Sequence, residues 1–317
     1  FLRVCLVSLE TAAEKHWHEI EVLISDNDST DDTREVVAEF QQRFPILYFK
    51  NETNIGGEPN FFAAGTRATA DHVWIFGDDD VFGPDAITAI LSYIHRSYDL
   101  IVVNFSDWSR QMDVQLKPSY LPWPESRTFD DSNEVLGTFR MHLGYISSIV
   151  VRKSILLAVP ESDYARFIPY GFPHPYSIYC GLLAGCLVAY DARPLFQRRA
   201  DNCVHFQGSE WLTNWLRVFL LGTAQIFEAL GEKGYSAAAV RKAKDRTVSE
   251  HRGGILVPEI GSIDRRKLFA QMWPHYRFCP HFWLFWVPAL VLPKRLLRGA
   301  HKMVRAKNAQ LACGSKP

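Results

Sequence analysis

Two acidic clusters in the first 80 residues have the side chains of a cation site. Asp78, Asp79 and Asp80 are consecutive, and residues 26–32 contain four more aspartates. Adjacent carboxylates repel one another unless a cation or water screens them. Carboxylates also suit Mg²⁺ or Mn²⁺ that arrives bound to a diphosphate, because such ions take few protein ligands. The alternative for the triplet is a solvated acidic turn that caps the helix expected after Pro84.

Both clusters follow short apolar runs that are typical of buried strands. The strands predicted for this half of the chain span residues 19–25, 46–49, 72–76 and 100–105. Helices are predicted between them, at residues 30–44 and 60–69 and after Pro84. This alternation predicts an α/β domain with a mostly parallel sheet, in which ligands bind at the carboxyl ends of the strands. We therefore expect the two acidic clusters to meet in one crevice.

The remainder of the chain predicts a loop-rich segment followed by helices. Residues 106–127 are rich in Trp, Pro and Ser and are expected to cross the active face. Further strands are predicted at 145–151 and 187–190, a helix at 176–187, and helices from 209 to 272. The predicted organisation is a donor half at 1–105, an acceptor half at 106–205, a helical extension at 206–280 and a tail at 281–317.

Three segments together resemble a known enzyme family. Residues 25–33 (SDNDSTDDT) resemble the DNxSTDxT segment of family 2 glycosyltransferases with the GT-A fold, and residues 54–60 (NIGGEPN) resemble their NxGxxxN segment. Residues 77–81 (GDDDV) stand in the place of the DxD motif. Residues 147–152 (SSIVVR) are similar to the abequosyltransferase-like branch, which builds bacterial surface polysaccharides. The resemblance implies a Rossmann-like α/β fold and a nucleotide-sugar donor.

The resemblance also implies a role for each acidic residue. Asp26 is expected to hydrogen-bond the nucleotide base, and Asp78 to lie near the ribose. Asp80, with Asp78, is expected to hold Mg²⁺ or Mn²⁺ on the diphosphate, while Asp79 either assists or faces solvent. The metal would stabilise the charge that develops on the leaving nucleoside diphosphate.

Other residues of the matching segments are candidates for donor binding. They are Asn27, Asp28, Asn54, Gly56, Asn60 and, further along the chain, Arg198. The alternative for Asn54 and Asn60 is a turn residue or a helix cap. The alternative for Arg198 is an exposed basic turn.

The sequence departs from the family pattern at two points. Family members begin with a strand that the helix expected at Phe1 should follow, so the resemblance implies that the chain is truncated before Phe1 and lacks this strand. They also carry a carboxylate pair that supplies the base, and no such pair lies between residues 143 and 199. His174 and Asp163 remain as candidate bases; an imidazole titrates near working pH. The alternatives are a rigid loop histidine and a surface carboxylate.

The C-terminal region combines aromatic and basic residues. Residues 282–292 (FWLFWVPALVL) precede six basic side chains between 294 and 305. The apolar run is too short to span a bilayer, but this composition is typical of an anchor that lies among anionic lipid headgroups. The alternative is a packed helix followed by a solvated basic tail.

The amino-acid composition bears on the partners and the cellular compartment of the protein. The 317 residues carry 35 basic and 35 acidic side chains, so we expect no nucleic-acid partner. Six cysteines lie without a CxxC pair, which favours a reducing compartment. We predict an enzyme on the cytoplasmic, inner face of the plasma membrane that transfers a sugar from a nucleotide-sugar donor to a lipid-linked saccharide acceptor, in O-antigen or capsule synthesis. The alternatives are an inactive binding protein and a nucleotidyltransferase, although the latter would need a Gly- and Lys-rich phosphate loop that the sequence lacks.

Overall fold

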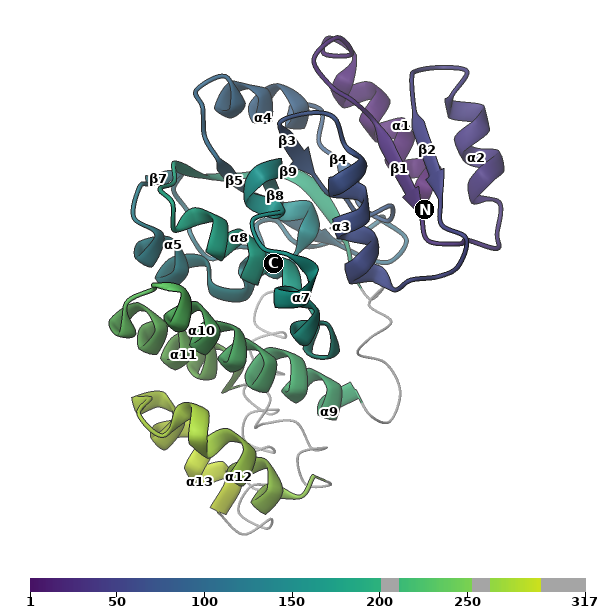
Figure 1. Ribbon diagram of the computed structural model, residues 1–317. Coiled ribbons are helices and arrows are strands. Elements are labelled where there is room, and N and C mark those ends of the chain that lie inside the picture. Colours follow the sequence, from purple (N-terminus) through teal and green to yellow (C-terminus); the bar gives the residue numbers. More distant parts are fainter. Residues whose placement is uncertain (201–210, 253–262, 292–317) are drawn as a thin grey trace, which may run out of the picture. The chain divides into compact units, whose positions relative to one another are not determined.

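The computed structural model describes residues 1–200, 211–252 and 263–291 (Figure 1). The chain divides into two compact units, Phe1–Cys203 and Val204–Pro317. The first unit is α/β and the second is helical. The α/β fold and the helical C-terminal region that the sequence predicted are both present. The predicted boundary after residue 205 lies next to the division between the units.

The first unit opens with a helix and a small parallel sheet. Helix α1 (Leu2–Ala13) buries Cys5, Leu6 and Leu9, which share one helical face. Strand β1 (Leu23–Asp26) then leads through α2 (Thr33–Phe40) to β2 (Leu47–Lys50), which pairs with β1 in parallel. The acidic residues 26–32 therefore form the loop at the carboxyl end of β1. Within the described ranges, β1 pairs with no strand other than β2.

The larger sheet has seven strands and is mixed. Its path runs β3-β8-β5-β9-β4, with β6 on β5 and β7 on β9. The strands are β3 (His72–Trp74), β4 (Val81–Phe82), β5 (Leu100–Trp108), β6 (Gln115–Lys117), β7 (Arg127–Phe129), β8 (Ile149–Arg152) and β9 (Val188–Arg199). Only β5 and β9 pair in parallel. The expectation of a mostly parallel sheet is thus wrong for this part, although the central pair has that arrangement.

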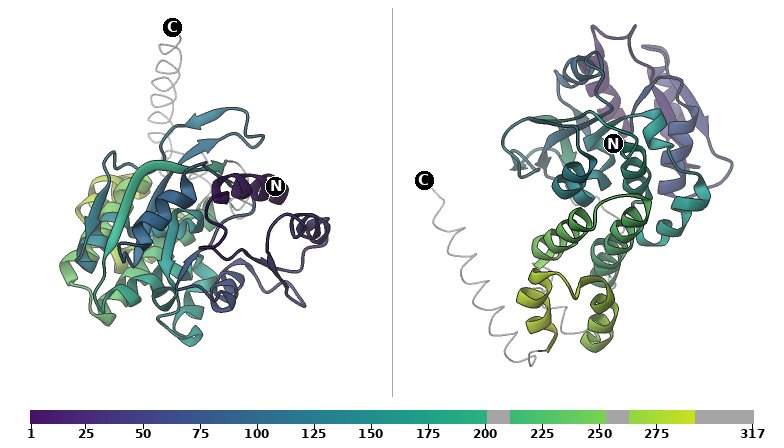
Figure 2. Two further views of the ribbon diagram at one scale, coloured as in Figure 1. Left: turned by 90° about the horizontal axis from the view of Figure 1, so that it is seen from above. Right: turned by 60° about the vertical axis from the view of Figure 1, so that its left-hand side comes forward.

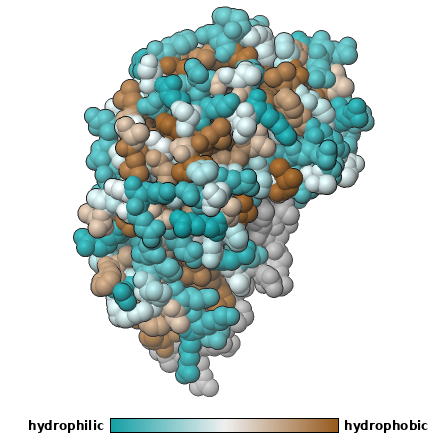
Figure 3. All heavy atoms as spheres, viewed as in Figure 1, coloured by the Kyte–Doolittle hydropathy of each residue, from teal (hydrophilic) through white to brown (hydrophobic). Residues whose placement is uncertain are grey.

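Helices cover the larger sheet and connect its strands (Figure 2). The α-helices are α3 (Gly57–Arg67), α4 (Ala86–Ile94), α5 (Ser132–Phe139), α6 (Lys153–Leu156), α7 (Glu161–Tyr164) and α8 (Pro173–Leu182). Three 3₁₀ segments, η1 (Arg140–Gly144), η2 (Ile146–Ser148) and η3 (Ala165–Tyr170), connect α5, β8, α7 and α8. Hydrophilic and hydrophobic residues are interspersed on the face shown in Figure 3.

Strand β9 is much longer than the sequence predicted. The basic-proline pair Arg193-Pro194 was expected to end it near Tyr190, but pairing with β5 continues to Arg199. The register shifts between Val103 and Phe105 of β5, so that the residues around Pro194 form a bulge. A bulge accommodates proline, which has no N–H to donate to a sheet. Because β9 continues, Arg198 and Arg199 reach the carboxyl end of β5.

The second unit consists of helices around one apolar core. Its elements are α9 (Trp211–Leu216), the π-helical η5 (Arg217–Gly222), α10 (Thr223–Lys233), α11 (Ala237–Glu250), α12 (Arg265–Tyr276), the π-helical η8 (Phe282–Trp286) and α13 (Val287–Val291). Met272, Tyr276, Phe282 and Trp286 are fully buried in the core. Among the described residues, no helix combines the length and the hydrophobicity needed to cross a membrane. Residues 292–317 of the predicted tail lie outside the described residues.

Candidate active site

The acidic triplet forms a tight turn between β3 and β4. The Asp80 N–H donates to the Gly77 carbonyl at 3.2 Å, which closes the turn. Asp78 remains accessible to solvent, Asp79 is half-buried, and Asp80 is only 1% exposed. The exposure of the three carboxylates thus decreases along the turn, from Asp78 at the surface to Asp80 in the interior of the unit.

Helix α1 and the segment before β8 hold this turn in place. The Ser8 hydroxyl accepts a hydrogen bond from the Phe82 N–H at 2.9 Å, and the Cys5 Sγ lies 3.9 Å from the Gly77 carbonyl oxygen. On the other side, the Ser147 Oγ accepts from the Gly77 N–H at 2.9 Å. Ser147 also belongs to the SSIVVR segment, so that segment supports the acidic turn directly.

The carboxylate of Asp80 is buried, and no cationic side chain of residues 1–200, 211–252 or 263–291 pairs with it. Its oxygens accept hydrogen bonds from the Tyr145 hydroxyl at 2.6 Å and from the Arg199 backbone N–H at 3.2 Å. Burial and the charge of Asp79 raise the pKa of Asp80 to about 6, although these hydrogen bonds and one from Ser147 favour the charged form. Burial, followed by Asp80 itself, also raises the pKa of Tyr145.

The two acidic clusters lie within electrostatic reach of each other. Surrounding protein atoms and the charge of Asp79 raise the pKa of Asp78, and Asp31 of the first cluster adds to this effect. No described basic side chain forms an ion pair with Asp78 or Asp80. A divalent cation therefore fits this turn, because it would stabilise two carboxylates that no described basic side chain pairs with. Across the described ranges, however, no three His, Cys, Asp or Glu side chains gather as a complete metal site.

Two arginines from the end of β9 border the acidic turn. The Arg199 Nε donates to the Asp79 carbonyl at 3.0 Å, and its guanidinium also donates to the Arg110 carbonyl. Arg198 forms two hydrogen bonds with the Asp107 carboxylate, at 2.6 and 2.8 Å. The predicted alternative of an exposed basic turn is therefore wrong, since both arginines belong to a strand and are buried or half-buried.

Aromatic rings surround the Arg198 guanidinium. Its carbon lies 4.3 Å from the centre of the Tyr120 ring, 5.5 Å from that of Phe105 and 5.6 Å from that of Tyr145. Stacking and the Asp107 ion pair fix the guanidinium in one orientation. Because the Tyr145 hydroxyl also binds Asp80, the same aromatic group links Arg198 to the acidic turn.

The loop after β1 is held by hydrogen bonds to Asp26. This side chain is 4% exposed and accepts from the Tyr48 hydroxyl at 2.5 Å and from the Ser29 N–H at 2.7 Å. Burial by itself would raise the pKa of Asp26, but these hydrogen bonds and the charge of Lys50 lower it overall. Asp28 adopts a positive φ of 66° and lies 3.4 Å from the Lys50 ammonium.

The asparagines of the matching motifs bind one another. Asn60 accepts hydrogen bonds from the Ser25 hydroxyl and the Asn51 amide, and donates to the Ser25 carbonyl, at 2.8 to 2.9 Å. The Asn27 amide likewise donates to Asn54 at 2.9 Å. This geometry matches the turn-residue alternative for Asn54 and Asn60, because their side chains tie the loops together.

Gly56 occupies the turn within this network. Its φ of 90° lies in the region that favours glycine, and its N–H donates to the Asn54 side chain at 3.0 Å. The asparagine network and this glycine therefore shape the loop beside Asp26.

The environment of His174 does not suit a base. The residue is 1% exposed, and its ring lies edge-on to the rings of Phe61 and Phe172. Burial lowers the pKa of His174 to about 4, so the ring is neutral at working pH but has no access to an acceptor in solvent. Asp163 is half-buried on the short helix α7.

Several residues of this site escaped the sequence prediction. Tyr145, Tyr48 and Asp107 contact Asp80, Asp26 and Arg198, but none belongs to a recognised motif. Of these three residues, Asp107 could have been identified as a candidate, because it is a carboxylate near the end of a predicted strand.

Comparison with known proteins relates the chain to glycosyltransferases. Residues 1–156 match the family model for glycosyl transferase family 2. A 202-residue stretch is 30% identical to the abequosyltransferase RfbV of Salmonella typhimurium strain LT2, covering 60% of this chain and 60% of that protein. The chain thus matches less than two thirds of the length of this relative.

The fold is also similar to solved structures. Those of S. aureus TarS residues 1–349 in complex with UDP and with UDP-GlcNAc superpose with TM-scores of 0.57 and 0.56. The UDP complex shares 14% sequence identity with this chain, and the match covers 85% of this chain and 70% of the TarS chain. For the UDP-GlcNAc complex the identity is 13%, and the match covers 86% of this chain and 78% of the TarS chain. At this identity the likeness establishes the fold alone.

The buried Asp80 carboxyl predicts a pH dependence of stability. The pKa of Asp80 is about 6 in the folded chain, above the ordinary value of 3.8 expected for the unfolded chain. The folded chain therefore binds this proton more tightly than the unfolded chain, and protonation stabilises the fold fully below pH 3.8. That contribution, about 3 kcal/mol, is lost as the pH rises to 6. Asp80→Asn removes the ionisation, and thermal unfolding with EDTA should show it gaining stability over the parent between pH 5 and pH 8. Asp78→Asn, at the solvent-accessible neighbour, should gain less; equal gains would contradict the assignment.

The asparagine network predicts that Asn60 stabilises the loop. Asn60→Ala leaves the partners of three hydrogen bonds unsatisfied and should lower the free energy of unfolding by about 2 kcal/mol in urea denaturation. Asn54→Ala is the matched control, because Asn54 also accepts two hydrogen bonds but is exposed. It should cost less than half as much. A larger loss of unfolding free energy in Asn54→Ala than in Asn60→Ala would show that Asn60 is not the residue that stabilises the network.

Proposed function

Because the chain belongs to glycosyltransferase family 2, we propose that it transfers a sugar from a nucleotide-sugar donor bound at the Asp78–Asp80 turn. The observation that carries this proposal is the buried Asp80 carboxylate, which no described cation neutralises. Carboxylates at a strand end that no described basic side chain pairs with are suited to a metal-bound diphosphate. The nucleotides in the TarS complexes support a donor of this class.

The residues of the turn have distinct roles in this proposal. Asp80 and Asp78 would hold Mg²⁺ or Mn²⁺, which supplies electrostatic stabilisation of the leaving diphosphate. Tyr145 and the Arg199 N–H orient the Asp80 carboxylate. Asp26 and the loop that it organises would receive the nucleotide base, and Asp28 and Asn27 would lie beside it.

Arg198 would supply a fixed positive charge near the reaction. Its ion pair with Asp107 and its aromatic neighbours leave the guanidinium pre-organised, so little conformational entropy is lost when an anion binds. Asp163 remains the candidate base for the acceptor hydroxyl, since the buried His174 has no route to solvent.

The acceptor is proposed from the relative. RfbV is named as an abequosyltransferase, and a related role here would place the chain in the synthesis of a bacterial surface polysaccharide such as O-antigen. We propose a saccharide linked to a lipid as the acceptor, and hence a location on the cytoplasmic face of the plasma membrane.

Donor binding tests this proposal. Thermal unfolding should be measured with UDP-, GDP-, CDP- and dTDP-sugars, with and without Mn²⁺. One donor at about 100 times its Kd should stabilise the chain by about 2.7 kcal/mol in a Mn²⁺-dependent way. Asp80→Ala should abolish this stabilisation, and the exposed Asp130→Ala should retain it. The absence of any stabilisation would favour the inactive binding protein.

A surface of the second unit supports the membrane location. We define the interfacial surface as Trp273, Arg277, Phe278, Trp283 and Leu284. Phe278, Leu284 and Trp283 are 73%, 63% and 47% exposed. The two tryptophan rings lie 5.5 Å apart, and the Trp283 indole donates to the Arg277 carbonyl at 2.8 Å, so the surface is continuous. Exposed aromatic residues beside arginine are typical of contact with anionic lipid headgroups.

This surface modifies the predicted anchor. Phe282 and Trp286 of the predicted apolar run are fully buried in the helical core, as the packed-helix alternative required. The exposed apolar side chains instead come from the end of α12, the following turn and one face of η8.

Vesicle flotation tests the interfacial surface. The double variant Phe278→Ser, Leu284→Ser removes two exposed apolar side chains and should weaken binding to vesicles of phosphatidylglycerol and phosphatidylcholine by about tenfold or more. Val114→Ser, Leu116→Ser is the matched control, because both residues are 55% exposed in the first unit. Equal binding by the two double variants would exclude this surface as the membrane contact.

A further inference from the structure

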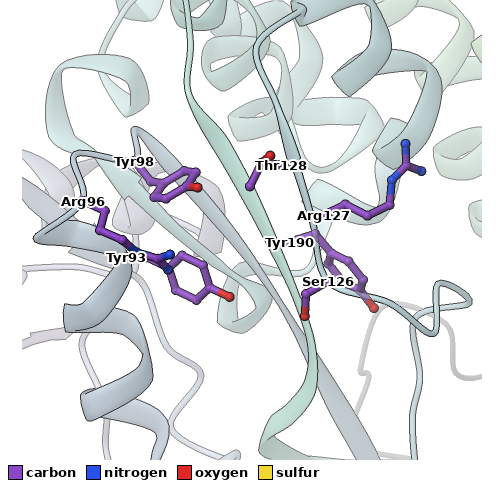
Figure 4. Close-up of a pocket in the computed structure, with 7 residues that line it drawn as sticks. All are labelled: Tyr93, Arg96, Tyr98, Ser126, Arg127, Thr128 and Tyr190. Carbon is purple, nitrogen blue, oxygen red and sulfur yellow. The ribbon is translucent and has the colours of Figure 1, made fainter.

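A pocket in the first unit lies apart from the acidic turn. It has a volume of about 500 Å³ and opens between the end of α4 and strand β7, with β9 behind it (Figure 4). Its lining residues are Tyr93, Arg96, Tyr98, Ser126, Arg127, Thr128 and Tyr190. Tyr190 and Arg198 lie eight positions apart on β9, which places the pocket roughly 25 Å along the strand from the proposed donor site.

Arg96 is held in the pocket by two aromatic rings. Its guanidinium carbon lies 4.7 Å from the centre of the Tyr93 ring and 5.4 Å from that of Tyr98. Its Nε donates to the Ser92 carbonyl at 3.0 Å, while its terminal nitrogens donate to no residue in the described part of the chain. The pocket therefore contains an exposed guanidinium, stacked on two rings, whose terminal donors are available to a ligand.

The carboxylates around the pocket are already occupied. Asp191 is fully buried and is bound by Arg193 at 2.6 Å, and it also accepts from the Tyr93 hydroxyl at 3.3 Å. Glu134 pairs with Arg127 at 3.0 Å. With these two carboxylates paired, the Arg96 guanidinium has no carboxylate partner among the described residues, which favours an anionic ligand.

Side chains with hydroxyl groups lie on both sides of the pocket. Figure 4 shows the Tyr98 ring on the α4 side and Thr128 on the β7 side, and neither hydroxyl bonds to a residue of the described ranges. The Ser126 hydroxyl accepts from the Ala192 N–H at 3.0 Å and keeps its own proton to donate. Tyr190 is 1% exposed and forms the floor of the pocket. Its hydroxyl already donates to the Trp123 carbonyl and accepts from the Asn104 amide.

We propose that this pocket binds an acidic saccharide, with the carboxylate or phosphate on Arg96 and the sugar hydroxyls on Tyr98, Ser126 and Thr128. Charge-assisted hydrogen bonds from a pre-organised guanidinium suit either acid. The volume lies in the range of ligand pockets, about 300 to 1,000 Å³. The pocket shares no residue with the donor site, so this binding does not depend on the proposed function.

Saturation-transfer NMR on the full chain tests the pocket. The probes are glucose 1-phosphate, glucuronate and glucose, and inorganic phosphate is measured by its displacement of glucose 1-phosphate, all in EDTA to suppress metal-dependent binding at the acidic turn. Both sugar acids should bind more tightly than glucose and inorganic phosphate. Arg96→Met should weaken both acids by about tenfold, and Tyr98→Phe should weaken them less.

Arg166→Ala is the matched control. Arg166 also stacks on two rings, those of Phe167 and Tyr176 at 4.7 and 5.8 Å, but lies outside the pocket. It should leave binding of the sugar acids unchanged, and the thermal unfolding of each variant verifies its fold. No binding, or equal losses in Arg96→Met and Arg166→Ala, would overturn the proposal. Binding of inorganic phosphate as tight as that of glucose 1-phosphate would overturn its saccharide part.

Discussion

The first unit is organised around the Asp80 carboxylate, which it buries without a counter-charge from residues 1–200. Removing Asp80 from water costs free energy unless hydrogen bonds or a counter-charge compensate. The structure supplies a phenol from Tyr145 and a backbone N–H from the end of β9. These donors hold the carboxylate in one orientation, and no basic side chain of the described residues balances its charge, so a cation would fit beside it.

Strand β9 brings the parts of this arrangement together. It pairs with β5 in parallel from one end to the other, past the bulge at Pro194, and so delivers Arg198 to Asp107. The same strand presents Tyr190 to the pocket at its opposite end. One continuous element therefore fixes the positions of two groups of residues that share no side chain.

The sequence allowed prediction of features that depend on neighbouring residues. It did not allow prediction of contacts between residues that lie far apart along the chain. The strand ends at Asp26 and Asp78 were predictable because apolar runs stop there abruptly. The partners of Asp80 and Arg198 were not, since 65 and 91 residues separate Tyr145 and Asp107 from them. An apolar run such as Leu100–Phe105 shows that a strand is buried on both faces but not the direction of its neighbours, so the antiparallel pairings were missed. His174 was misjudged because its two flanking prolines suggested an open loop, whereas α8 packs the ring inside.

The asparagine network beside Asp26 differs in kind from the acidic turn. Asn27, Asn51, Asn54 and Asn60 are joined through amide groups, and the charged group bound to them is the Arg67 guanidinium, which donates to Asn51 at 2.9 Å. Mobile ions screen charges but leave hydrogen bonds between neutral groups nearly unaffected. The amide contacts are therefore expected to persist over a wide range of ionic strength, while the charged contact between Asp28 of the same loop and Lys50 weakens.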